Sequence, residues 1–302
     1  MRILCGFLIW IFASYCCAWN AIGHQLIAQI AYDHLNPEAK QQCDKLLAKA
    51  CKQQDFKCKP KMILSGRMSH RYGLQISSHW TKCKKKKPLL SNCFVSISTW
   101  LDVIKYKNNH HFDTLHYIDI PYSLDGSPLP DIDGQNALNG IYQALLILKS
   151  SKSSEKNKAL HLKILIHIVG DIHQPLHTIT AVSALHPKGD CGGNLFLLGK
   201  NSIAPNLHAY WDRGGGWLLK NNKPQILEKA HELEAAWSCG EDELGSTPEA
   251  WIKKSHDLAM ADSYALNPGS VPTMQYQMRA QNIIQKQIFF AGCRLAYLLN
   301  TI

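Results

Sequence analysis

The sequence lacks three patterns, and each absence excludes or disfavours a class of protein. No Cys-x-x-Cys pair occurs among its eleven cysteines, which disfavours a metal site built from thiolates. Alternating polar and apolar stretches are scarce, so little β-sheet is expected. After the first eighteen residues, no segment approaches the roughly 20 apolar residues that span a bilayer. We therefore expect a mainly helical chain with no membrane-spanning segment after residue 18.

The amino terminus has the pattern of a signal peptide. Arg2 precedes an apolar run from Ile3 to Ala13, and small residues follow up to Ala18. The run is too short for a membrane anchor. We expect cleavage after Ala18 and a mature chain, residues 19–302, that is secreted or periplasmic.

The cysteine count agrees with export. Eight of the eleven cysteines remain after residue 18, and an even number in an exported chain predicts disulfides. The sequence does not give their pairing. The eight are Cys43, Cys51, Cys58, Cys83, Cys93, Cys191, Cys239 and Cys293.

Acidic residues are fewer than basic ones. The chain has 33 Lys and Arg against 23 Asp and Glu, a formal net charge of +10. This balance favours polyanionic partners. Many basic exported proteins bind no nucleic acid, however, and a run such as Lys84–Lys87 is often a solvated loop. Charge alone does not identify a partner.

Apolar residues recur at helical spacing through much of the chain. We see no internal repeat or domain boundary, so residues 19–302 are expected to form one all-α domain with a short β-hairpin at most, near Phe196–Leu198. A Cys- and Lys-rich insertion at about 49–98 and a polar linker at Ser150–Lys158 interrupt the pattern. The predicted helices are Ile22–Leu35, Ala137–Lys149, Leu160–Ile172, Gln225–Trp237, Thr247–Leu266 and Gln275–Leu299.

The most informative motif is His167-Ile-Val-Gly-Asp171-Ile-His-Gln-Pro-Leu-His177. His167 and Asp171 are four residues apart and share one helix face. Pro175 should end the helix, which leaves His177 just beyond it. Three metal-binding side chains can thus converge at one helix end, whereas a single histidine there would more often be structural. His173 faces another direction and is interpreted as structural.

Two further groups carry the same residue types. His208 and Asp212 repeat the spacing of four, although such a pair alone could be an ordinary surface or capping pair. Asp102 and His116 add another carboxylate and imidazole. Histidine and aspartate without cysteine suit zinc better than iron or manganese.

The mature start Trp19-Asn-Ala-Ile-Gly-His24, together with these groups, closely resembles the S1/P1-type zinc nucleases, whose fold is related to that of zinc phospholipase C. The resemblance covers most of the mature chain and implies three Zn²⁺ ions. The amine and carbonyl of the N-terminal Trp are zinc ligands in that family. The implied ligands are Asp102, His116, His167 and Asp171 for one ion, Trp19, His24 and the shared Asp171 for a second, and His177, His208 and Asp212 for a third.

The resemblance also implies substrate contacts. Tyr117 and Asp119 match positions that bind a nucleobase, by stacking and by hydrogen bonding. Asn194, in Gly192-Gly193-Asn194, matches a position near the phosphate, although a tight turn is the simpler interpretation. Lys105 replaces an Arg near the transition state and keeps its charge without the bidentate fork. The implied catalytic residues are Asp102, Lys105 and Asp171.

The implied function is a zinc-dependent phosphodiesterase that hydrolyses single-stranded DNA and RNA to 5′-phosphorylated products and also acts as a 3′-nucleotidase. No stable protein partner is implied. A zinc phospholipase C is the first alternative, but its third ion takes Glu where this chain has Asp212. A non-catalytic zinc- or nucleic-acid-binding protein is the second alternative. It is disfavoured because structural zinc sites usually have four protein ligands, whereas the site of His177 has three and no sulfur.

Overall fold

A computed structural model describes residues 19–54, 92–105, 107, 110–123, 125–219, 226–240 and 246–302. The predicted signal peptide, the Lys84–Lys87 run and most of the Cys- and Lys-rich segment lie outside these residues. Within them, none of the helices combines the length and apolar character needed to cross a membrane.

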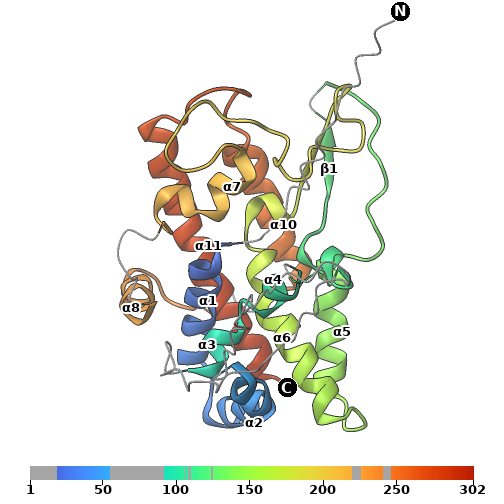
Figure 1. The fold of residues 1–302 in the computed structure, drawn as a ribbon, viewed down its shortest axis with the longest axis vertical. Coiled ribbons are helices and arrows are strands. Elements are labelled where there is room, and N and C mark those ends of the chain that lie inside the picture. Colours follow the sequence, from blue (N-terminus) through green and yellow to red (C-terminus); the bar gives the residue numbers. More distant parts are fainter. Residues whose placement is uncertain are drawn as a thin grey trace, which may run out of the picture.

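The described chain is mainly helical, as predicted (Figure 1). The α-helices are α1 (Ala21–Asp33), α2 (Pro37–Gln54), α3 (Cys93–Ile97), α4 (Trp100–Lys105), α5 (Ala137–Lys149), α6 (Glu155–Asp171), α7 (Leu207–Asp212), α8 (Ile226–Ala236), α10 (Pro248–Leu258) and α11 (Met274–Asn300). Short 3₁₀ helices are η1 (Asp113–His116), η2 (Pro175–His177) and η3 (Gly214–Gly216), and η4 (Ala259–Ser263) is a π-helical turn that follows α10.

Helix α6 runs through the middle of the described core and contacts α1, α4, α5 and α11. The Ser154 side chain accepts a hydrogen bond from the Asn157 amide and so caps the start of α6. From Ile164 to Asp171 every residue is buried. A helix that is buried on all sides needs apolar residues all round, and the exceptions here are His167 and Asp171. These two polar residues therefore need polar or ionic partners inside the core.

The sheet is small and differs from the predicted hairpin. Strand β1 (Pro121–Ser123) pairs in parallel with β2 (Thr180–Val182), with Tyr122 opposite Ala181. A parallel pair needs a long crossover, which α5 and α6 provide. At the predicted hairpin, the described chain has a single antiparallel bridge, between Leu197 and Asn206.

Several helix boundaries also differ from prediction. α5 has the predicted bounds, but α6 begins at Glu155, inside the predicted polar linker, because Ser154 caps it. Helix α2 was not predicted, since its residues are mostly polar, and it extends into the predicted insertion. Helices α3 and α4 are too short to show a helical period.

The cysteines are only partly paired. A disulfide joins Cys239, just after α8, to Cys293 in α11. Cys93 is also disulfide-bonded. Among the described residues, Cys43 and Cys191 are thiols. The prediction of disulfides is confirmed, but the even number of cysteines did not mean that all are paired.

Candidate metal centre

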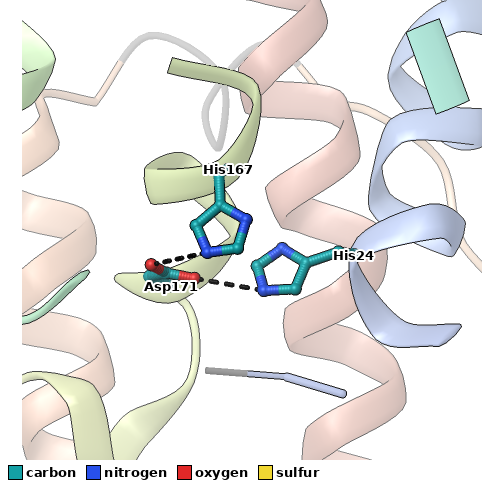
Figure 2. Close-up of side chains that lie close together, drawn as sticks. All are labelled: His24, His167 and Asp171. Carbon is teal, nitrogen blue, oxygen red and sulfur yellow. Dashed lines mark ion pairs between the residues drawn. The ribbon is translucent and has the colours of Figure 1, made fainter. Parts of the chain in front are cut away.

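The carboxyl-terminal end of α6 forms the centre of the site. His167 and Asp171 share one face, as predicted, with Nε2 3.4 Å from Oδ2. His24 comes from α1, and its ring stacks on that of His167 with a centroid distance of 3.9 Å. Figure 2 shows these three side chains, with His24 Nε2 3.3 Å from Asp171 Oδ1. Asp171 thus faces a different imidazole with each of its two oxygens.

Two more predicted ligands complete this first cluster. Asp102 in α4 places Oδ1 3.6 Å from Nε2 of His167. His116, at the end of η1, places Nδ1 3.0 Å from Asp171 Oδ2 and 3.9 Å from Asp102 Oδ1. All these side chains are almost completely buried. Asp171 and four other residues, drawn from four helical elements in all, therefore form the first cluster.

A second cluster combines His177, His208 and Asp212, whose ligand atoms lie within 4.8 Å of one another. Pro175 begins η2 beyond the end of α6, as predicted, and brings His177 towards α7. The side chain of Gln174 donates a hydrogen bond to Asp212 Oδ1 at 2.8 Å. The other oxygen of Asp212 faces His208 Nε2 at 3.6 Å.

Backbone carbonyls determine how three of the histidines present their ring nitrogens. Nδ1 lies 2.6 Å from the Ser98 carbonyl in His167, 2.6 Å from the His116 carbonyl in His177 and 2.7 Å from the Gly192 carbonyl in His208. A carbonyl only accepts hydrogen bonds, so each Nδ1 carries the proton. In the neutral ring, each Nε2 then has a lone pair directed into the cluster, which is the state a metal ligand requires.

The loop that carries Gly192 depends on glycine. Gly192 has a φ of +60°, and a Cβ there would lie 2.2 Å from the carbonyl oxygen of Leu176. Asn194 is buried in the same loop, and its side-chain amide donates to the Cys191 carbonyl at 2.8 Å. The structure therefore places Asn194 in the loop that orients His208.

Trp19 lies between the two clusters. Its indole N–H donates to the carbonyl of Gly170 at 2.9 Å, next to Asp171. The backbone N–H of Asn20 donates to the carbonyl of Asp212 at 3.1 Å. Gly23 permits this arrangement, because a Cβ at that position would lie 2.7 Å from Cβ of Trp19. The backbone of Trp19 is thus placed near ligands of both groups.

The first cluster has the properties of a cation site. Among the described residues, no hydrogen-bond partner is found for either ring nitrogen of His24, for Asp102 Oδ1 or for Asp171 Oδ1, although all four atoms are shielded from solvent. Buried polar atoms normally have partners. Burial raises the pKa of Asp171 well above its usual value and lowers the pKa of His24 and of His116. A divalent cation would let the carboxylate ionise while the imidazoles stay neutral.

Lys105 is buried on α4, one turn after Asp102. Its positive charge contributes to lowering the pKa of His116, after burial and the charge of His167. Lys105 therefore lies within electrostatic range of the first cluster.

Tyr117 and Asp119 follow His116 in an extended segment beside the second cluster. The amide of Ile118 donates to the carbonyl of His177 at 2.9 Å. Burial and then the negative charge of Asp190 raise the pKa of Asp119 to about 7. Asp190 itself accepts hydrogen bonds from the hydroxyl of Tyr264 and from the amide of Ala181. The carboxyl group of Asp119 is thus poised to change its protonation state near neutral pH.

His173 is structural, as predicted. Its Nδ1 contacts the carbonyl of Val169 at 2.7 Å, and its Nε2 accepts a hydrogen bond from Arg294 of α11 at 2.8 Å. Sequence reasoning did not identify Gln174 or Asp190. Gln174 stands inside the central motif, but only the fold reveals that it contacts Asp212.

Comparison with known proteins agrees with this geometry. A family model described as S1/P1 Nuclease matches residues 19–302. Nuclease S1 of Aspergillus oryzae is 27% identical over 240 residues, covering 68% of this chain and 78% of that protein. Endonuclease 4 of Arabidopsis thaliana is 28% identical over 241 residues, covering 68% and 76%. Nuclease P1 of Penicillium citrinum is 23% identical over 315 residues, covering 94% and 97%. Because the family model matches the whole chain from Trp19 onward, the chain belongs to the S1/P1 nuclease family.

Proposed function

We propose that this family member, a hydrolase acting on phosphodiester bonds, is a zinc-dependent nuclease that cleaves single-stranded DNA and RNA and leaves 5′ phosphates. It also hydrolyses the phosphate of 3′-nucleotides. The observation that carries the proposal is the convergence of two buried His and Asp clusters at the end of α6, with Trp19 between them. Residues 1–18 direct its export.

Three zinc ions are proposed, and the two clusters suit them. Asp102, His116, His167 and Asp171 would hold the first, and Asp171 would be shared with the second, held by His24 and Trp19. His177, His208 and Asp212 would hold the third. When bound, zinc supplies a water with a pKa lowered to about 7 and positive charge for the phosphate oxygens.

Three residues of the chain would assist the reaction directly. Asp102 Oδ1, which has no hydrogen-bond partner among the described residues, can accept a hydrogen bond from the attacking water and so orient it. Asp171, whose two oxygens face His116 and His24, would hold these two imidazoles in place. Lys105, buried on the same helix as Asp102, would balance the negative charge of the phosphate.

The preference for single strands would come from Tyr117 and Asp119. Tyr117 would stack on a nucleobase, and Asp119 would hydrogen-bond to its edge. A base must leave its helix stack to reach such a position, and a duplex resists that step. Asn194 would support the loop beside the phosphate.

The deciding experiment is chelation of the purified protein. EDTA is expected to abolish hydrolysis of single-stranded DNA and RNA, and added Zn²⁺ is expected to restore it, since each proposed step depends on the metal. The same preparation should cleave duplex DNA far more slowly. Full activity in metal-free protein would disprove the proposal. Hydrolysis of phosphatidylcholine instead of RNA would indicate a phospholipase, and bound zinc without turnover would indicate a non-catalytic protein.

The protonation of Asp119 gives a pH-dependent prediction. With a pKa of about 7, this carboxyl carries its proton below pH 7 and can donate it to an acceptor on the base; above pH 7 it is ionised and cannot. KM for oligonucleotides should therefore rise about tenfold between pH 6 and pH 8. In Asp119→Asn the amide donates at every pH, so KM should stay constant. If KM rose equally with pH in the unmodified protein and in Asp119→Asn, Asp119 would be excluded from base binding.

A further inference from the structure

A second group of metal-binding side chains lies where α1 meets α8. Asp33 is the last residue of α1, and His34 follows it as the helix cap. His231 and Glu234 are three residues apart on α8 and so share one face of that helix. α1 and α8 pack against each other, which brings the two pairs together.

The distances fit a metal ion. One ligand atom each from Asp33, His231 and Glu234 lies within 4.8 Å of the others. His34 Nε2 lies 3.4 Å from Glu234 Oε1. The group thus contains two imidazoles and two carboxylates, and these are zinc ligands in proteins.

The existing contacts leave negative charge in this group without full compensation. Asp33 Oδ2 accepts a hydrogen bond from the Gln29 amide at 2.8 Å. Glu234 Oε1 is shielded from solvent, and its contact is the 3.4 Å approach of His34 Nε2. Burial and then the charge of Asp33 raise the pKa of Glu234, and His34 and His231 offset only part of this rise. A cation between the two carboxylates would remove their repulsion.

We propose that Asp33, His231 and Glu234, with His34 beside them, bind a divalent cation of the zinc type that links α1 to α8. The site is separate from the metal centre and shares no residue with it. His24 lies nine residues before Asp33 on the same helix, which places the two sites about 14 Å apart along α1. His34 has 41% of its side-chain surface exposed, so this site binds zinc more weakly than the buried clusters.

The position of the site indicates what the cation does. The Cys239–Cys293 disulfide attaches the chain just after α8 to α11. A cation held by α1 and α8 would be a second cross-link of α8, to α1 instead of α11. Zinc at this site therefore stabilises the packing of α8 without taking part in hydrolysis.

The test counts zinc ions per chain by native mass spectrometry over a series of buffered zinc concentrations. His231→Ala and Glu234→Gln remove ligands, and both positions are at least partly exposed, so the fold should tolerate the changes. Glu232→Gln is the matched control, because it removes an exposed carboxylate from the same helix outside the cluster. The unmodified protein and Glu232→Gln should bind one zinc more than the other two variants, at the higher zinc concentrations. All four should hydrolyse single-stranded DNA at similar rates.

Thermal unfolding provides a second measurement. Adding zinc within the same concentration range should raise the Tm of the unmodified protein and of Glu232→Gln, but not that of His231→Ala. Equal zinc counts in all four proteins would overturn the proposal. Failure of the proposed catalytic function would give a different result, because zinc at the metal centre or hydrolysis of DNA would then be lacking in all four proteins alike.

Discussion

Asp171→Asn is expected to lower kcat/KM for single-stranded DNA by at least about 10³-fold, more than any other single substitution in the centre. Loss of a group that only supports a metal ligand typically lowers metal affinity or activity about 10- to 100-fold. Asp171 faces His116 with one oxygen and His24 with the other, at 3.0 and 3.3 Å, and is the proposed ligand of two ions. Asparagine has nearly the same shape, but it is neutral and turns an N–H₂ group towards one of the two proposed ions.

The measurement combines kinetics with a zinc count. Asp171→Asn should retain its fold, because the replacement is isosteric, and should bind fewer zinc ions than the unmodified protein. His173→Gln is the control, since His173 lies two residues further along and contacts Arg294 instead of the cluster. Folded His173→Gln should have an activity within about tenfold of that of the unmodified protein. A control as inactive as Asp171→Asn, at equal stability, would contradict the assignment of helix faces.

A single methionine added before Trp19 is expected to remove one zinc ion and most of the activity. Trp19 is fully buried, and the contacts of its indole and of Asn20 place its backbone between the clusters. Its nitrogen is a free amine only when Trp19 is the first residue. Any preceding residue converts it to an amide, whose lone pair is delocalised and binds zinc poorly at neutral pH.

The comparison requires two preparations that differ only at this end. Protein starting at Trp19 should hold three zinc ions, and the extended protein about two, with low activity on single-stranded DNA. Both should show the same helical circular dichroism, because the extension leaves the core unchanged. Equal zinc content and equal rates in the two preparations would exclude Trp19 as a ligand.

The sequence predicted best those features that depend on neighbours along one helix. The His167–Asp171 and His208–Asp212 pairs follow from helical periodicity alone, and so does the exclusion of His173. Asn136 caps α5 through its side chain, a local signal that agrees with the predicted start at Ala137. These interactions need no knowledge of the rest of the fold.

Contacts between distant segments do not follow from spacing along the chain, and the grouping of His24 with His167 and Asp171 was expected from the family resemblance alone. The stacking of His24 on His167 and the bond from Gln174 to Asp212 join different elements, and no spacing rule reports them. The same holds for the effect of Asp190 on Asp119. Helix α2 was missed for a different reason, because a mostly polar helix on the surface has a weak apolar stripe.

One residue connects the two clusters. The ring of His116 faces Asp171 in the first cluster, while its carbonyl accepts the hydrogen bond that orients His177 in the second. Ordering of the His116 ring by a cation would also order its backbone and would lower the entropy cost of placing His177. Uptake of the metal ions should therefore be cooperative, and by reciprocal linkage loss of the ion beside His177 should weaken retention of the others.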